Sequence, residues 1–143
     1  MIRELGKEET GLAYAAMLEL RPRIGNPADF VQTVNEVQRP EGYRLVGSFA
    51  DGDEQAAAAA GFREAHFLAW GHCVYVDDLS ARPTFRRQGH AGMLLDWLLE
   101  EARRLGCQQL HLDSGVGPDR QDAHRLYLNR RLRISSHHFQ IDL

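Results

Sequence analysis

Positively charged residues stand next to a glycine at the beginning of the stretch FRRQGHAGMLLDWLLEEARRLG, residues 85–106. Arg86 and Arg87 precede Gly89, and a strongly apolar stretch with helical spacing follows at once. The first N–H groups of a helix have no partner inside the helix and carry partial positive charge. Glycine lets a ligand approach this backbone closely, and the arginines add fixed charge. The stretch therefore predicts an anion site suited to a phosphate or pyrophosphate. In the alternative, the arginines are solvated and Gly89 only forms a turn.

Two adjacent carboxylates, Asp77 and Asp78, are a second group of candidate catalytic or binding residues. They stand at the end of the run HCVYVDDLSA, which is typical of a buried strand and is a costly place for unpartnered charge. One of them could face a cleft and bind or deprotonate an amine. In the alternative, one side chain faces solvent and the other caps the following loop. Asp113 and Ser114 end the next expected strand and are further candidates.

Both helices and strands are expected to position the candidate residues named above. Hydrophobic spacing predicts helices over residues 6–23, 25–42, 90–105 and 120–132, and strands over 2–5, 43–50, 72–81, 107–115 and 133–143. Asn26 is the expected N-cap of the second helix, with Pro27 in its first turn. The second half contains a strand–helix–strand unit, which implies a parallel pair with a right-handed crossover.

The alanine-rich segment 55–70, QAAAAAGFREAHFLAW, is ambiguous. Propensity alone favours a helix. However, Gly61 interrupts the run, and the preceding Asp51-Gly52 turn requires a hairpin partner for the strand before it. We therefore expect a strand.

The spacing of RRQGHA resembles a known motif. Arg86, Gly89 and Ala91 match the [RQ]-x-x-G-x-[GA] pattern of the GNAT superfamily of N-acetyltransferases, and the motif stands between a strand and a long helix as in that family. Downstream, Ala123 and Tyr127 match the family's A-x-x-x-Y segment. The resemblance implies an α/β fold with a GNAT-type mixed, mostly antiparallel central sheet flanked by helices. It also implies one domain over residues 1–143.

The resemblance implies acetyl-CoA as the acetyl donor. Its pyrophosphate would lie on backbone N–H groups between Arg87 and Gly92, and its pantetheine arm would pair with the strand that precedes the loop. The residues expected to bind the cofactor are Leu79, Ser80, Ala81, Arg86, Arg87, Gln88, Gly89, His90, Ala91 and Gly92.

The same resemblance assigns the general acid to Tyr127, which would protonate the leaving thiolate. Spacing alone favours the alternative, a core aromatic on an amphipathic helix. Asp78 is the expected second catalytic residue, on the acceptor side. The chain departs from the family pattern at Arg120, where an asparagine is common, and at Arg131-Leu132, where the family has Gly-Phe.

The predicted function is transfer of an acetyl group to a primary amine of a small molecule, a lysine or an N-terminus, within a ternary complex. We also expect a homodimer, with the last segment at its interface. One alternative is a non-catalytic acyl-CoA-binding regulatory module. Another is an enzyme that carries a succinyl or longer acyl group.

Length, charge and composition narrow the classes of protein to which the chain could belong. A chain of 143 residues fits one domain, and a net charge of −3 argues against a general nucleic-acid binder. The N-terminal run has no apolar core of the kind that a signal peptide needs, and no stretch is apolar enough to span a bilayer. Cys73 and Cys107 are expected to be reduced core thiols in a cytoplasmic protein. The seven histidines show no ligand spacing, so we expect no metal.

Overall fold

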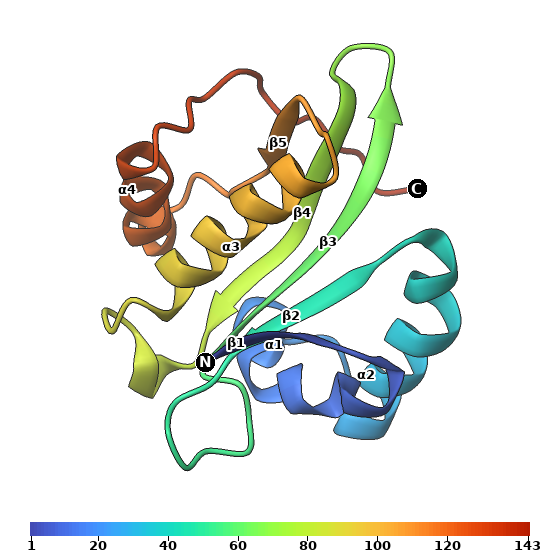
Figure 1. Ribbon diagram of the computed structural model, residues 1–143, viewed down its shortest axis with the longest axis vertical. Helices are drawn as coiled ribbons and strands as arrows, with labels where there is room; N and C mark the ends of the chain where they lie inside the picture. Colours follow the sequence, from blue (N-terminus) through green and yellow to red (C-terminus); the bar gives the residue numbers. More distant parts are fainter. The chain divides into compact units, whose positions relative to one another are not determined.

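The sheet has five strands in the order β1-β2-β3-β4-β5 (Figure 1). The structure is a computed structural model that describes all 143 residues. The strands are β1 (Ile2–Leu5), β2 (Arg44–Ser48), β3 (Ala58–Phe67), β4 (Gly71–Ala81) and β5 (Gln109–Leu112). The pairs β1–β2, β2–β3 and β3–β4 are antiparallel. The expected mostly antiparallel sheet is confirmed.

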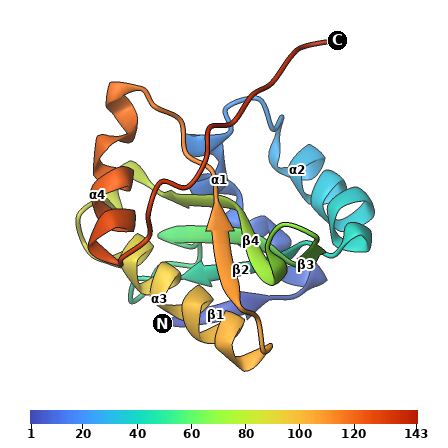
Figure 2. The same ribbon diagram turned by 90° about the horizontal axis from the view of Figure 1, so that it is seen from above.

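The helices are α1 (Tyr14–Leu20), α2 (Pro27–Thr33), α3 (His90–Arg104) and α4 (Gln121–Asn129). The chain divides into two compact units, Met1–His111 and Leu112–Leu143. In the first unit, α1 and α2 cover one face of the sheet and α3 covers the other (Figure 2). Asn26 caps α2 as expected, because its side chain accepts a hydrogen bond from the Asp29 N–H. No helix combines the length and apolar character needed to cross a membrane.

The alanine-rich segment is strand β3, in spite of its helix propensity. Residues Ala56 to Ala60 are 0% exposed, because β3 lies in the middle of the sheet and helices pack on both of its faces. Small side chains allow α1 and α3 to approach the sheet closely. Tertiary packing therefore outweighs the local preference, as expected for a central strand.

The second unit, Leu112–Leu143, contains α4 and an extended tail. The expected final strand over residues 133–143 is wrong, since that segment has neither helix nor strand. A strand needs a neighbour for its backbone ladder, and alternating side chains alone do not supply one. The large apolar side chains of the tail are mostly exposed: Ile134, Phe139, Ile141 and Leu143.

The end of α4 explains one departure from the family motif. Arg131 has a φ of 65°, in the left-handed region that favours glycine. Its N–H donates to the Leu128 carbonyl, and the Leu132 N–H donates to the Tyr127 carbonyl. These are the two hydrogen bonds of a Schellman ending, whose left-handed position is usually glycine. The chain keeps the turn with an arginine at a conformational cost.

We expect Arg131→Gly to raise the free energy of unfolding by about 1 kcal/mol, because glycine adopts this φ without steric conflict. Chemical denaturation with circular dichroism measures the change. Arg131→Ala is the matched control, since it removes the same side chain and keeps the Cβ. Equal effects of the two substitutions would show that the backbone conformation is not the cause.

A charged cluster fastens the C-terminal half of α3 to the sheet. Glu101 is 7% exposed and accepts hydrogen bonds from Arg104 and from Arg44 of β2 (2.7 Å). Arg44 also pairs with Glu4 on β1 (2.7 Å). The Arg104 guanidinium first, and Arg44 next, outweigh burial and lower the pKa of Glu101 to about 2. The cluster therefore joins β1, β2 and α3 through the Arg44 guanidinium, which pairs with Glu4 and with Glu101.

Glu101→Gln should lower the free energy of unfolding by about 2 kcal/mol at neutral pH, because two arginines lose their charged partner. The folded-state pKa of Glu101 is depressed, so its contribution is complete above about pH 4.5 and disappears as the pH falls toward 2. The parent should lose stability across that window more steeply than the variant in urea titrations. Glu100→Gln, at an exposed pair with Arg103, is the control and should have little effect.

Candidate active site

An extra residue in β4 decides where the two aspartates point. Gly61 of β3 pairs with Asp78, but the next residue, Phe62, pairs with Val76, so Asp77 has no partner in the ladder. Consecutive residues of a regular strand face opposite sides of the sheet. This β-bulge breaks the alternation and brings both carboxylates to the side that carries α1. The alternative considered from the sequence, in which one side chain faces solvent and the other caps the following loop, does not occur.

Asp78 accepts hydrogen bonds at both carboxylate oxygens. Oδ1 accepts from Nε of Arg21 (2.8 Å), the residue that ends α1, and Oδ2 accepts from the hydroxyl of Tyr43 (2.9 Å). The Asp78 side chain is 13% exposed. The carboxylate is therefore held from two directions and still reaches the surface.

Asp77 forms a separate pair with Arg63 of β3. The guanidinium donates from Nε and Nη2 to the carboxylate, with a shortest distance of 2.7 Å. Burial raises the pKa of Asp77, and the hydrogen bonds from Arg63 offset part of this effect. The Arg63 guanidinium also stands 5.6 Å from the centre of the Tyr43 ring. Both aspartates thus belong to one cluster around Tyr43.

Tyr43, like Arg21 and Arg63, is a member of the cluster that sequence reasoning missed. It precedes β2 directly, is 3% exposed, and its ring lies over Gly61. A Cβ at position 61 would stand 1.7 Å from the Tyr43 hydroxyl oxygen. Burial first, and Asp78 next, raise the pKa of Tyr43 well above its usual value. The one available signal was Gly61, an isolated glycine inside a strand, which indicates a bulge or a close approach.

The end of β4 has an open edge within the first unit. Leu79, Ser80 and Ala81 pair with β3 on one side. On the other side, the Gln108 N–H donates to the His72 carbonyl at the start of β4 (2.8 Å), and the four-residue β5 follows. Whatever its direction, so short a strand does not reach the last residues of the eleven-residue β4. This is the edge along which the pantetheine arm is predicted.

The loop between β4 and α3 has the features of an anion cradle. Gly89 is the N-cap of α3 with a φ of 86°, and no side chain caps the first-turn N–H groups. A Cβ at Gly89 would meet nothing within 4 Å, so the space before the helix is open. Arg86 and Arg87 are exposed, and Arg87 has a left-handed φ of 62°. The predicted residues from Arg86 to Gly92 therefore lie together around one helix start.

A buried polar contact fixes this helix start to the sheet. The His90 Nδ1 lies 2.8 Å from the hydroxyl oxygen of Ser48 on β2, and both side chains are buried. The Phe85 ring meets the His90 imidazole edge to face, with centroids 5.6 Å apart. His90 was expected in the cofactor loop, and here its side chain points into the protein, so only its backbone remains for an anion.

Tyr127 lies on α4 in the second unit and is buried. Burial raises the pKa of Tyr127, and Arg120 opposes this effect. Nearby in the same unit, His124 Nε2 lies 3.1 Å from the Ser114 hydroxyl and 2.8 Å from the Gly115 carbonyl. A tyrosine phenol is protonated at neutral pH even at its usual pKa, and the raised pKa of Tyr127 does not change this state, which a general acid requires.

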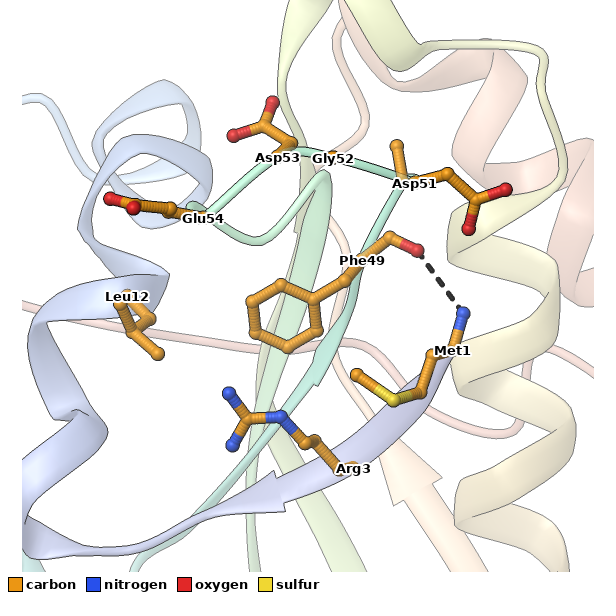
Figure 3. A pocket seen from close by; sticks show the side chains of 9 residues that line it. Met1, Arg3, Leu12, Phe49, Asp51, Gly52, Asp53 and Glu54 are labelled. Carbon is orange, nitrogen blue, oxygen red and sulfur yellow. Dashed lines mark hydrogen bonds between the residues drawn. The ribbon is translucent and has the colours of Figure 1, made fainter.

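A surface hollow in the first unit is lined by none of these residues. It has a volume of about 480 Å³ and is lined by Met1, Arg3, Leu12 and residues 49–54 of the β2–β3 loop (Figure 3). Its polar groups are partly engaged: the Met1 amine donates to the Phe49 carbonyl (3.1 Å), and Asp53 pairs with Arg82 (2.8 Å). No group of three or more metal-ligating side chains gathers anywhere in the structure.

A family model described as "Acetyltransferase (GNAT) family" matches residues 12–131. The match includes the loop before α3, the bulged strand and the helix that carries Tyr127. The chain belongs to the GNAT family of acetyltransferases. The resemblance seen in the RRQGHA motif is thereby confirmed, and this GNAT protein is an acyltransferase by family.

Relatives of this GNAT protein include a named but uncharacterised N-acetyltransferase, YhdJ of Bacillus subtilis (strain 168). It is 29% identical over 124 residues, which cover 87% of this chain and 84% of the relative. A Trypanosoma brucei acetyltransferase has the same fold, with a TM-score of 0.80 and 17% identity over 100% of this chain and 99% of that chain. So does aminoglycoside N-acetyltransferase AAC(6')-Iy in complex with CoA, with a TM-score of 0.81 and 16% identity, covering 100% and 93%.

The cradle at α3 is open to a direct test with Gly89→Glu. The new side chain would project into the open space before the helix and place negative charge there. We expect the parent to bind acetyl-CoA with a Kd of micromolar order, and the variant to bind at least about 100-fold more weakly. Isothermal titration calorimetry measures both.

Gly52→Glu is the matched control for that substitution. Gly52 also has a left-handed φ, of 78°, and open space around its Cβ position, but it lies in the β2–β3 loop. It should bind acetyl-CoA like the parent. Tight binding by a folded Gly89→Glu protein would exclude the cradle as the cofactor site.

Proposed function

We propose that this GNAT protein transfers an acetyl group from acetyl-CoA to a primary amine, on a small molecule, a lysine side chain or a protein N-terminus, by direct attack in a ternary complex. The observation that carries the proposal is the start of α3. There the N-terminus of the helix has no side-chain cap and begins at Gly89, and two exposed arginines precede it in the loop after β4. The chain also matches the family over residues 12–131.

The residues present suit the pyrophosphate of acetyl-CoA. First-turn N–H groups without a side-chain cap can donate to phosphate oxygens, and the helix dipole favours negative charge at this end. Arg86 and Arg87 add charge, while Leu79, Ser80 and Ala81 offer a strand edge for the amides of the pantetheine arm. That a structural neighbour is known in complex with CoA supports this choice of ligand class.

In the proposed reaction, the lone pair of a neutral amine attacks the thioester carbonyl. The C–N bond forms, the C–S bond breaks, and a thiolate leaves. The amine nitrogen loses one proton to the Asp78 carboxylate, which accepts two hydrogen bonds and has further lone pairs. Tyr127 donates its phenolic proton to the thiolate, and proton exchange with solvent restores Tyr127 and Asp78 before the next turnover. A backbone N–H near Leu79 is the proposed donor to the developing oxyanion.

The alternatives differ in measurable ways. A non-catalytic acyl-CoA-binding regulator would keep the cradle and show no turnover. An enzyme for succinyl or longer acyl groups would prefer those donors in direct competition with acetyl-CoA. The presence of Tyr127 at the position of the family's tyrosine supports a catalytic protein over the first alternative.

We also propose that the protein forms a homodimer and acts in the cytoplasm. Four large apolar side chains of the tail, Ile134, Phe139, Ile141 and Leu143, are mostly exposed in the single chain. Burial against a second copy would remove this surface from water. Both cysteines are free thiols, which suits a reducing compartment.

Tyr127→Phe tests the catalytic assignment. With a library of primary amines that includes polyamines, aminoglycosides and peptides, release of CoA should be detectable for the parent. The variant should lose about 100-fold or more in kcat with its best acceptor, because the leaving thiolate lacks its acid. Its affinity for acetyl-CoA, measured by calorimetry, should be unchanged. Full activity of the variant would remove Tyr127 from the mechanism, and the absence of turnover with every amine would favour the binding module.

A further inference from the structure

We infer that Tyr43 is a positioning residue for Asp78, and that Gly61 provides the space in which Tyr43 does this. The inference rests on the proposed function, since it concerns how the acceptor-side carboxylate is aimed. It assigns a role in catalysis to Tyr43, which directly precedes β2, and to Gly61 of β3. Both residues lie outside the cofactor loop and outside the motifs that define the family resemblance.

The first support is the way in which the Asp78 carboxylate is held. Its two oxygens have different donors, Arg21 from the end of α1 and Tyr43 from the residue directly before β2. A carboxylate fixed at both oxygens cannot rotate without losing a hydrogen bond. The remaining lone pairs then point in a defined direction, which a group that must meet a substrate N–H requires.

Of the two donors, Tyr43 is the more rigid. The Arg21 side chain is 51% exposed, so water competes for its guanidinium and its long chain keeps much of its freedom. Tyr43 is 3% exposed, and its ring lies against Gly61 on one side with Arg63 nearby. Its hydroxyl donates to Asp78 from this buried position (2.9 Å). The buried phenol therefore sets the orientation, and Arg21 supplies charge.

The second support is the contact between Tyr43 and Gly61. Besides the 1.7 Å approach to the hydroxyl oxygen, a Cβ at position 61 would come within 2.1 Å and 2.4 Å of two ring carbons. No small shift removes three overlaps with a buried aromatic ring. Gly61 is also the residue paired with Asp78, so the bulge, the glycine and the tyrosine act at one point of the sheet.

The test is a double-mutant cycle on turnover, using the best acceptor from the amine screen. Tyr43→Phe removes one hydroxyl and keeps the ring, so the fold should be retained. We expect kcat to fall about 10-fold while the KM for acetyl-CoA stays unchanged, because the cradle is a separate site. In an Asp78→Asn background, Tyr43→Phe should cause little further loss, because a positioning residue acts through the group that it positions.

Tyr14→Phe is the matched control. The Tyr14 hydroxyl also makes one hydrogen bond, to the Gly25 carbonyl (2.6 Å), but it does not touch the cluster. Its loss should leave kcat unchanged. Gly61→Ala gives a second measurement, and where it folds, by circular dichroism, its kcat should fall at least as far as that of Tyr43→Phe.

The outcomes separate this inference from the proposed function. No turnover by the parent with any amine overturns both. Turnover by the parent together with parent-like kcat in Tyr43→Phe overturns the inference alone. Equal losses from Tyr43→Phe in the parent and in Asp78→Asn would also overturn it, since the tyrosine would then act by a route that does not involve Asp78. A folded Gly61→Ala protein with parent-like kcat would overturn the role of the glycine.

Discussion

The bulge at Asp77 is the constraint on which the candidate site depends. Without the extra residue, Asp77 and Asp78 would face opposite sides of the sheet, and one carboxylate would be directed at the apolar contacts of α3. With it, both carboxylates meet the cations of α1 and β3. The bulge also sets the register of everything that follows in β4, including the edge at Leu79–Ala81 and the turn toward the anion cradle.

The cradle itself depends on how α3 is anchored. Two polar contacts join this helix to β2, one at each end: His90 with Ser48, and Glu101 with Arg44. Apolar packing of Leu94, Leu95 and Leu98 lies between them. Apolar contacts resist separation but are weakly directional, whereas buried hydrogen bonds fix a register. The helix start is therefore held in position without any contribution from the groups that would meet the ligand.

Local patterns predicted what local forces decide. The α3 motif and the Asn26 cap could be read from spacing and turn residues. The strand identity of the alanine-rich segment was inferred from Gly61 and the preceding turn, against a local helix propensity that tertiary packing outweighs. The acceptor-side cluster could not, because Tyr43 and Arg21 lie 35 and 57 residues from Asp78 in sequence, and nothing in VYVDDLS marks an extra residue. The tail was predicted wrongly for a related reason. Alternation in HHFQIDL shows that a strand could form, but a strand also needs a neighbour, and sequence periodicity carries no information about one.

The Tyr43 ring occupies the space that a side chain at position 61 would need, and this has an evolutionary consequence. Neither residue can be substituted alone without a cost. A side chain at 61 excludes the ring, and a smaller residue at 43 leaves a void beside the bulge. Among relatives, the two positions should therefore change together, with glycine accompanying the aromatic residue and a bulkier residue accompanying its loss. Such covariation would mark the GNAT proteins whose acceptor-side carboxylate is held by a buried phenol, even where the carboxylate itself is shared by all.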